Sequence, residues 1–256
     1  MRQNCHMISS LISLFLILGG GMTMSAQGPP VRLTAPGTLG FQGSALRTFG
    51  SFDNREQGSS YTQVVAVPYN FSTDFQAGLI MRYSFINPNG RNSFNGLNNS
   101  TLFLKHQLVV KNDVARTFRL SALIRQSFPT GKEMIAPELY STFIGISAGD
   151  ISTKRGFYTN LGYVLRTNDF SDVFQYDLAV GLPLLPQVYP LKQFNTFLEL
   201  NGSLDLDGNH VLSLSPGIQF IKGIFLIETS LQLPLIQPSG LNEKEFNLIL
   251  GTRILM

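Results

Sequence analysis

Along most of this chain, apolar and polar residues alternate with a period of two. From Asn195 to Phe220, for example, leucines recur at alternate positions, and Glu199, Asn201 and Ser203 stand between them. Successive side chains of a β-strand point to opposite faces, so this period predicts strands with one apolar and one polar face. The segments that carry the period lie near residues 44–52, 60–69, 75–85, 100–110, 117–127, 141–150, 156–166, 172–183, 194–204, 209–221, 224–235 and 245–255.

The number and length of these segments restrict the fold further. About twelve segments, mostly near 9–11 residues, have the length of a tilted membrane-spanning strand, whereas strands of globular proteins cluster near 5–6 residues. Only 14% of the residues are charged, against about 25% in a typical soluble domain. We therefore predict an all-β fold, a transmembrane antiparallel up-and-down β-barrel of about twelve strands in the cell outer membrane. A soluble β-sandwich, which also alternates but buries its apolar face, is the alternative.

The N-terminal residues have the pattern of an export signal. Arg2 precedes an apolar run from Ile8 to Leu18, and the small residues Ser25 and Ala26 suit a cleavage site. The run is shorter than the roughly 20 residues that a membrane-spanning helix needs. We therefore predict a signal peptide over residues 1–26, with an N-terminal membrane anchor as the alternative. Residues 27–43 then form a Pro/Gly-rich arm without periodicity, a candidate plug of the lumen, and residues 44–256 form the barrel.

The expected loops alternate in length, as they do in bacterial outer-membrane barrels. With the N-terminus in the periplasm, the longer connections face outside and the short ones face the periplasm. The longer connections are 53–59, 86–99, 128–140 and 236–244, and the short ones are 70–74, 111–116 and 222–223. The stretch 184–193 breaks this rule, because it would be a long periplasmic turn.

One catalytic pattern occurs, in a context that does not suit catalysis. Gly145-Ile146-Ser147-Ala148-Gly149 matches G-x-S-x-G, whose mechanism needs a strand-turn-helix elbow, but here the match lies inside an expected strand. The phase of the alternation turns Ser147 inward and His106 outward. We therefore predict that the protein is not an enzyme. A lipid-modifying hydrolase that uses these two residues is the alternative.

The sequence gives little support for other site chemistry. It contains no spaced pattern of His, Cys and carboxylates and no phosphate-loop or dinucleotide signature, so we expect no metal and no cofactor. A formal net charge of +3, without a basic run, gives no argument for a nucleic-acid partner. The expected partners are outer-membrane lipid, the barrel-insertion machinery and a small-molecule solute.

The remaining candidates for a functional site are charged side chains on the inward phase of the expected strands. Either they line a permeation path and set its charge preference, or they form ion pairs and hydrogen bonds that fill the barrel, because a buried charge must be paired. About twelve strands give a width between barrels that side chains fill, at roughly 8 strands, and open porins at 16–18. The lumen-lining candidates are Arg82, Lys105, Arg119, Arg125, Arg166, Asp177, Glu199, Glu228 and Arg253.

The chain from residue 95 to its end carries several short family-like motifs. These are SFPTGKE from Ser127 to Glu133, NTFLELN from Asn195 to Asn201, LSPGIQ from Leu214 to Gln219, and Leu233-Pro234-Leu235 before the last strand. Together they resemble the family named for the MetA-pathway of phenol degradation, transporter-like outer-membrane β-barrels of Gram-negative bacteria. The resemblance implies a channel or uptake protein for small hydrophobic or aromatic molecules. The alternatives are the hydrolase above and a structural or interaction barrel without transport.

Overall fold

The computed structural model describes residues 30–168, 170–185, 192–238 and 243–256. The predicted signal peptide and most of the stretch 184–193 lie outside these ranges. The described part contains no helix that could span a membrane. Its strands are β1 (Ala45–Arg55), β2 (Gly58–Asn70), β3 (Phe75–Pro88), β4 (Phe94–Leu97), β5 (Ser100–Asp113), β6 (Arg116–Phe128), β7 (Ser141–Ser152), β8 (Gly156–Arg166), β9 (Val173–Pro183), β10 (Lys192–Asp205), β11 (His210–Lys222), β12 (Phe225–Ile236) and β13 (Lys244–Leu255).

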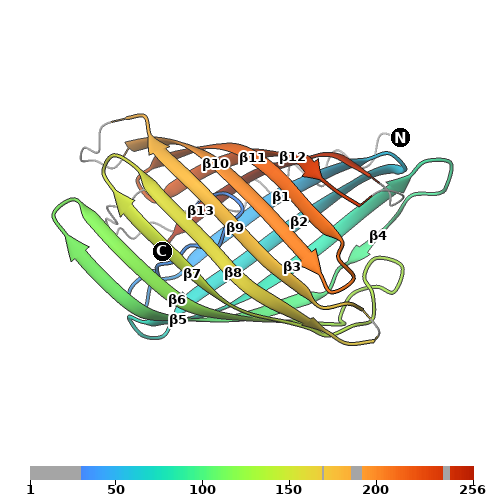
Figure 1. Cartoon of the computed structure of the whole chain (residues 1–256), viewed down its shortest axis with the longest axis horizontal. Coiled ribbons are helices and arrows are strands. Elements are labelled where there is room, and N and C mark those ends of the chain that lie inside the picture. Colours follow the sequence, from blue (N-terminus) through green and yellow to red (C-terminus); the bar gives the residue numbers. More distant parts are fainter. Residues whose placement is uncertain (1–29, 169, 186–191, 239–242) are drawn as a thin grey trace.

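All of these strands belong to one antiparallel sheet that closes on itself (Figure 1). From β5 to β13 each strand pairs with the next along the chain, β13 pairs with β1, and β1, β2 and β3 lead back to β5. The described ring therefore contains twelve strands, while β4 pairs with β3 alone. The predicted up-and-down barrel of about twelve strands is confirmed.

The expected segments match the strands of the ring to within about three residues at either end. The prediction was wrong at β4, because the expected polar loop 86–99 contains this four-residue strand. Residues 94–97 of β4 pair with residues 83–86 of β3. Four residues give too few alternations for a period to be recognised in the sequence.

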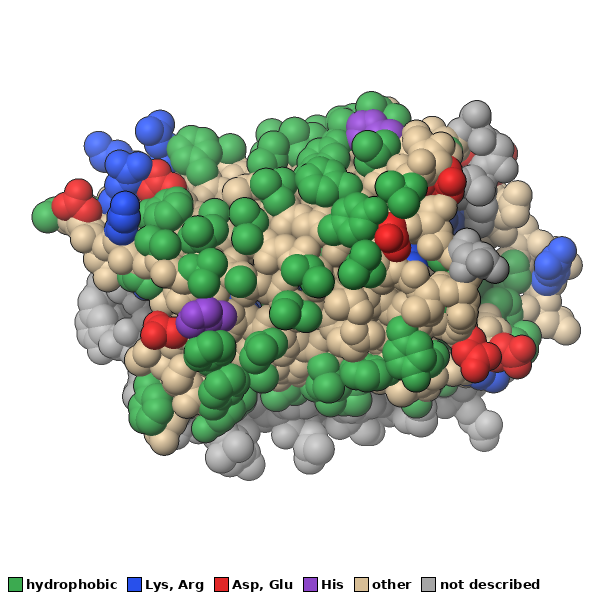
Figure 2. Space-filling view, turned by 60° about the horizontal axis from the view of Figure 1, so that its bottom comes forward, with side chains coloured by type: hydrophobic (Ala, Val, Ile, Leu, Met, Phe, Trp, Pro, Cys, Tyr) green, Lys and Arg blue, Asp and Glu red, His purple; other side chains and the backbone are tan. Residues whose placement is uncertain are grey.

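The distribution of side chains across the barrel wall is the reverse of that in a soluble protein. On β10 Leu198 is 51% exposed on the outer face, while the adjacent Glu199 is 0% exposed on the inner face. Figure 2 shows apolar side chains spread over the outer wall and charged side chains gathered toward its two ends. A closed barrel with an exposed apolar band is suited to a bilayer, and this places the protein in the outer membrane. The soluble-sandwich alternative is excluded.

Glycines make two of the reversals between the strands. Gly208, in the turn between β10 and β11, has φ of 85°, and Gly223 between β11 and β12 has φ of 60°. Both lie in the left-handed region, which glycine adopts without steric cost.

At the seam where β13 meets β1, Ser44 and Met256 exchange two backbone hydrogen bonds of 2.8 Å, so Met256 takes part in closing the ring.

Candidate functional site

The interior of the barrel holds residues 30–39, which we call the belt. Its contacts follow the inner wall in roughly descending strand order, so the belt lies within the ring rather than beside it. They are with Arg253 of β13, Glu199 of β10, Ser147 of β7, Ser121 of β6 and Lys105 of β5, and with Thr73 between β2 and β3. The belt lies within residues 27–43, the Pro/Gly-rich arm without periodicity that was expected as a candidate plug of the lumen.

Glu199 is the main acceptor for the belt backbone. Its carboxylate accepts the backbone N–H groups of Val31 at 2.9 Å, Arg32 at 3.1 Å and Leu33 at 3.2 Å. Three successive N–H groups that converge on one anion form the kind of concavity that binds anions in proteins. Charge-assisted hydrogen bonds are also stronger than neutral ones. The Glu199 carboxylate therefore anchors the belt at mid-wall.

The Arg32 side chain connects the belt to β12 and β13. Its guanidinium donates to Ser230 at 3.3 Å, to Gln232 at 3.3 Å and to the side chain of Asn247 at 2.8 Å. Burial lowers the pKa of Arg32 to about 10, and the nearby Glu199 opposes that shift. At neutral pH the side chain stays charged.

Apolar contacts hold the next residue of the belt. Leu33 is 2% exposed and packs with Tyr158 of β8, Ala179 of β9 and Phe197 of β10. These side chains stand on the inner phase of their strands, so the inner wall is apolar at this point. A polar inner face was expected on every strand, and this patch departs from that expectation.

On the opposite side of the barrel, β5, β6 and β7 hold the belt through its carbonyl groups. The ammonium of Lys105, a side chain that is 2% exposed overall, donates to the carbonyl oxygens of Ala35 and Gly37. The Ser121 hydroxyl donates to Pro36, and the Ser147 hydroxyl donates to Thr34 at 2.9 Å. The belt thus offers N–H groups to the acid of β10 and carbonyl groups to the donors of β5 to β7.

A buried ion cluster bridges the seam between β1 and β13. Glu228 of β12 is 1% exposed and pairs with Arg47 of β1 at 2.8 Å and with Arg253 of β13 at 2.6 Å. The two arginines also donate to the carbonyl oxygens of Val31 and Pro30. The cluster therefore joins three strands and the start of the belt.

Beyond the belt, toward the end of the barrel that carries the long loops, inward arginines are only half-buried. Arg82 donates to the Asn99 carbonyl at 3.2 Å and to the Thr101 hydroxyl at 2.9 Å. Lys105 pairs across the sheet with Leu123, so Arg125 lies two residues, ~7 Å of strand, nearer the loops. The guanidinium of Arg125 stacks on the Phe143 ring at 3.9 Å.

An apolar cluster and one carboxylate also line the interior between the belt and the long loops, which we call the upper interior. Leu123, Phe143, Val164 and Val173 are buried together, with Phe103 packed against them. Asp177 of β9 accepts a hydrogen bond of 3.1 Å from Asn201 of β10.

The nine sequence-derived candidates thus fall into several environments. Glu199 and Lys105 bind the belt, Glu228 and Arg253 belong to the seam cluster, and Arg82, Arg125 and Asp177 line the upper interior. Arg119 donates to Gln107 at 3.2 Å, and its side chain lies close against Gly37 of the belt. Arg166 is exposed at the end of β8, where its backbone N–H donates to the Asp172 side chain.

Sequence reasoning missed Arg32 and Arg47, although both lie in the interior. Arg47 stands on the inward phase of β1, and the alternation around it was the signal that could have identified it. Arg32 lies in the aperiodic arm, where no pattern indicates direction.

Ser147 and His106 are not assembled as a hydrolytic pair. Ser147 is 0% exposed on the inner face and is bound to the belt. The His106 ring stacks on the Phe75 ring at 4.0 Å on the outer face. The barrel wall separates the two side chains. Among the described residues no group of three His, Cys or carboxylate side chains could hold a metal ion.

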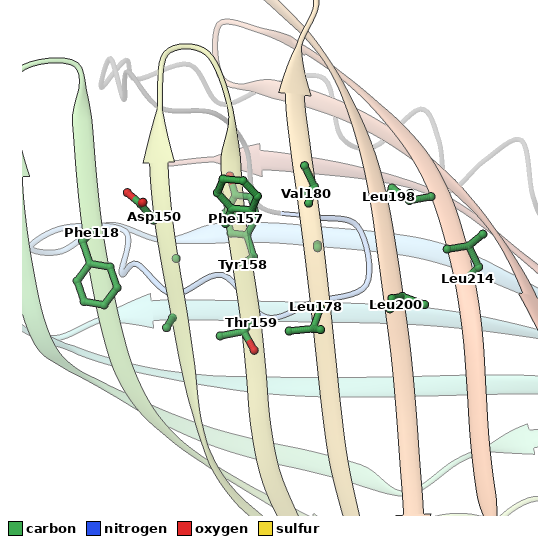
Figure 3. Close-up of a pocket in the computed structure, with 13 residues that line it drawn as sticks. Phe118, Asp150, Phe157, Tyr158, Thr159, Leu178, Val180, Leu198, Leu200 and Leu214 are labelled. Atoms are coloured by element: carbon green, nitrogen blue, oxygen red, sulfur yellow. The ribbon is translucent and has the colours of Figure 1, made fainter. Parts of the chain in front are cut away.

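A depression of about 520 Å³ lies on the outer wall, away from the interior. Figure 3 shows its lining side chains on neighbouring strands, among them Phe118, Leu178 and Leu198. They are 36%, 48% and 51% exposed, respectively, and they surround the small residue Ala148. In the membrane this depression faces lipid, so it is separate from any path through the lumen.

Comparison with known proteins supports the fold. No protein-family model and no curated protein matches the chain, so the resemblance to the phenol-degradation family stays a prediction. The structure is similar to the COG4313 outer membrane channel from Pseudomonas putida F1, with a TM-score of 0.64 and 11% identity over 90% of this chain and 100% of that one. It is also similar to the NanC porin, with a TM-score of 0.55 and 14% identity over 82% of this chain and 98% of that one. This chain therefore shares the barrel fold of outer-membrane channels.

Proposed function

We propose that the protein is an outer-membrane channel or uptake protein through which small molecules diffuse, and that the belt narrows its lumen. The observation that carries this proposal is the inner wall above the belt. There Arg82, Arg125, Asp177 and Asn201 are inward-facing and only half-buried. Side chains inside a closed barrel are reached by solvent only where the lumen is not filled.

The belt gives the channel a constriction at about mid-height. Glu199, Ser121 and Ser147, which bind it, are each 0% exposed, in contrast to the half-buried arginines nearer the loops. A twelve-strand barrel is wider than one that its own side chains fill, at roughly 8 strands. Residues 30–39 occupy part of that additional width.

The apolar cluster favours solutes with an apolar body. Phe103 and Phe143 stand on the inner wall beside Arg125, where a purely aqueous pore would carry polar groups. This agrees with the hydrophobic or aromatic solutes that the family resemblance implies. Outer-membrane lipid covers the outer wall, and we expect the barrel-insertion machinery to assemble the protein.

Liposomes that contain the purified protein test the channel directly. We expect them to become permeable to small solutes, and we expect a variant that lacks residues 27–43 to be more permeable. Heat-modifiable gel mobility controls for folding, because a folded barrel migrates differently before and after boiling. If both folded proteins leave the liposomes impermeable, the barrel is a structural or interaction protein.

A further inference from the structure

Positive charge exceeds negative charge in the interior of the barrel. Between the two rims, the described residues place seven cationic side chains against three anionic ones, an excess of four. The cations are Arg32, Arg47, Arg82, Lys105, Arg119, Arg125 and Arg253, and the anions are Asp177, Glu199 and Glu228. Nearer the loop rim Asp53 pairs with Lys244 and Arg55, which leaves the excess in place.

The excess of positive charge is concentrated on the wall that β3, β5 and β6 form. Glu228 is shared by two arginines, and Glu199 is occupied by the belt. By contrast, none of the four inward-facing cations of β3, β5 and β6 forms a salt bridge within the described residues. These four are Arg82, Lys105, Arg119 and Arg125. Their partners are backbone carbonyls, a hydroxyl, an amide and an aromatic ring. Asp177 lies on the inner face of β9 and interacts electrostatically with Arg125.

Such a wall attracts anions. Cations in a low-dielectric surrounding interact strongly with any counter-charge that reaches them. A cleft lined by one sign of charge also concentrates ions of the opposite sign, and rings of Arg and Lys line anion-selective pores.

We propose that the channel selects small organic acids, molecules with one carboxylate and an apolar body such as an aromatic ring. This inference rests on the proposed channel function. The Arg82 and Arg125 guanidinium groups supply donors that match a carboxylate. Phe103 pairs with Arg125 across β5 and β6 and is only partly buried, so it supplies the contact for the ring. Leu123 and Phe143 are buried and support Phe103 and Arg125 from the wall. Chloride can bind only the guanidinium groups, and a neutral aromatic molecule can contact only the apolar side chains.

A planar bilayer under a potassium chloride gradient tests the charge preference. The reversal potential should show that chloride passes several-fold more readily than potassium. The R82Q/R125Q variant should lose most of that preference, and the R82K/R125K variant should keep it. R155Q is the matched control, because Arg155 stacks over Phe157 outside the lumen and its loss should leave the reversal potential unchanged.

Competition tests the apolar part of the site. Benzoate should reduce the chloride current at roughly tenfold lower concentration than acetate, because its ring buries additional apolar surface. Benzyl alcohol should have little effect. A conducting protein without anion preference, or one in which R82Q/R125Q changes nothing, overturns this inference while the channel stands. If neither the full chain nor the variant lacking residues 27–43 conducts, the channel function itself fails and the substrate class fails with it.

Discussion

Replacement of Glu199 by alanine should release the belt. The change leaves the N–H groups of Val31, Arg32 and Leu33 without their shared acceptor. Each buried N–H that loses its partner costs about 1–3 kcal/mol, and water that enters the space of the lost side chain recovers part of this. At about 1 kcal/mol for each of the three groups, the free energy of belt docking falls by about 3 kcal/mol. The population of undocked belt then rises roughly a hundredfold.

A cysteine in the belt reports that population. Val31 is 0% exposed, and cysteine is close to valine in size, so V31C should react slowly with a maleimide while the belt is docked. Cys5, the single cysteine of the chain, is replaced by serine in every sample. When the belt exchanges faster than the thiol reacts, the labelling rate follows the undocked population. E199A should therefore raise the rate roughly a hundredfold over the parent protein.

Two further variants define what the labelling rate means. E199Q keeps one carbonyl acceptor and should give an intermediate rate. E245A removes a carboxylate that is exposed at the rim of the barrel, and it should leave the rate unchanged. If E199A labels within about threefold of the parent, well below the predicted factor, the carboxylate does not hold the belt.

Three other changes test the packing of the wall. E228Q leaves Arg47 and Arg253 without a counter-charge and should destabilise the barrel by about 3–5 kcal/mol, seen as a lower temperature for loss of the heat-modifiable band. D150N removes the carboxylate of the exposed pair with Arg116, and it should lower that temperature far less, because solvent screens an exposed ion pair. G202A places a Cβ where the Tyr176 ring lies, so it should displace that ring and break the 2.7 Å hydrogen bond between Tyr176 and His210. Tyrosine fluorescence and urea unfolding would show no change if the ring can move without cost. L198R places a charge on the lipid face and should cost about 2–4 kcal/mol in unfolding from lipid vesicles, while S203R at the inner face near the rim should cost clearly less.

The sequence was sufficient to predict the barrel wall because each strand of the ring repeats the same two-residue period. Leu198 and Glu199 illustrate this, since neighbours in the chain face lipid and lumen respectively. Strand β4 could not be predicted, because it has only four residues and lies against the loop that follows β6. Gly96 of β4 leaves the room that the Lys132 side chain of that loop occupies.

The contents of the interior were predictable only in part. Inward positions were expected to be polar, yet Tyr158, Phe197 and Leu123 are buried there. Tyr158 and Phe197 pack against Leu33 of the belt, and Leu123 packs with Phe143, whose ring lies under Arg125. Whether an inward charge meets a solute or a neighbouring residue depends on distances between strands that are far apart in sequence. The contact between Glu199 and the Val31 backbone, 168 residues away, is an example that no local pattern encodes.

The position of the belt has a consequence for the order in which the protein is assembled. Its partners Ser230 and Arg253 lie on β12 and β13, and Arg253 is 223 residues from the carbonyl of Pro30 that it binds. The belt is therefore synthesised first, but its contacts are complete only when the last strands are in place. A barrel that lacked β12 and β13 would keep the contacts of the belt with Glu199 and with β5 to β7, but it would lose those of Arg32 and Pro30. Complete docking of the belt therefore requires that β12 and β13 have already joined the barrel.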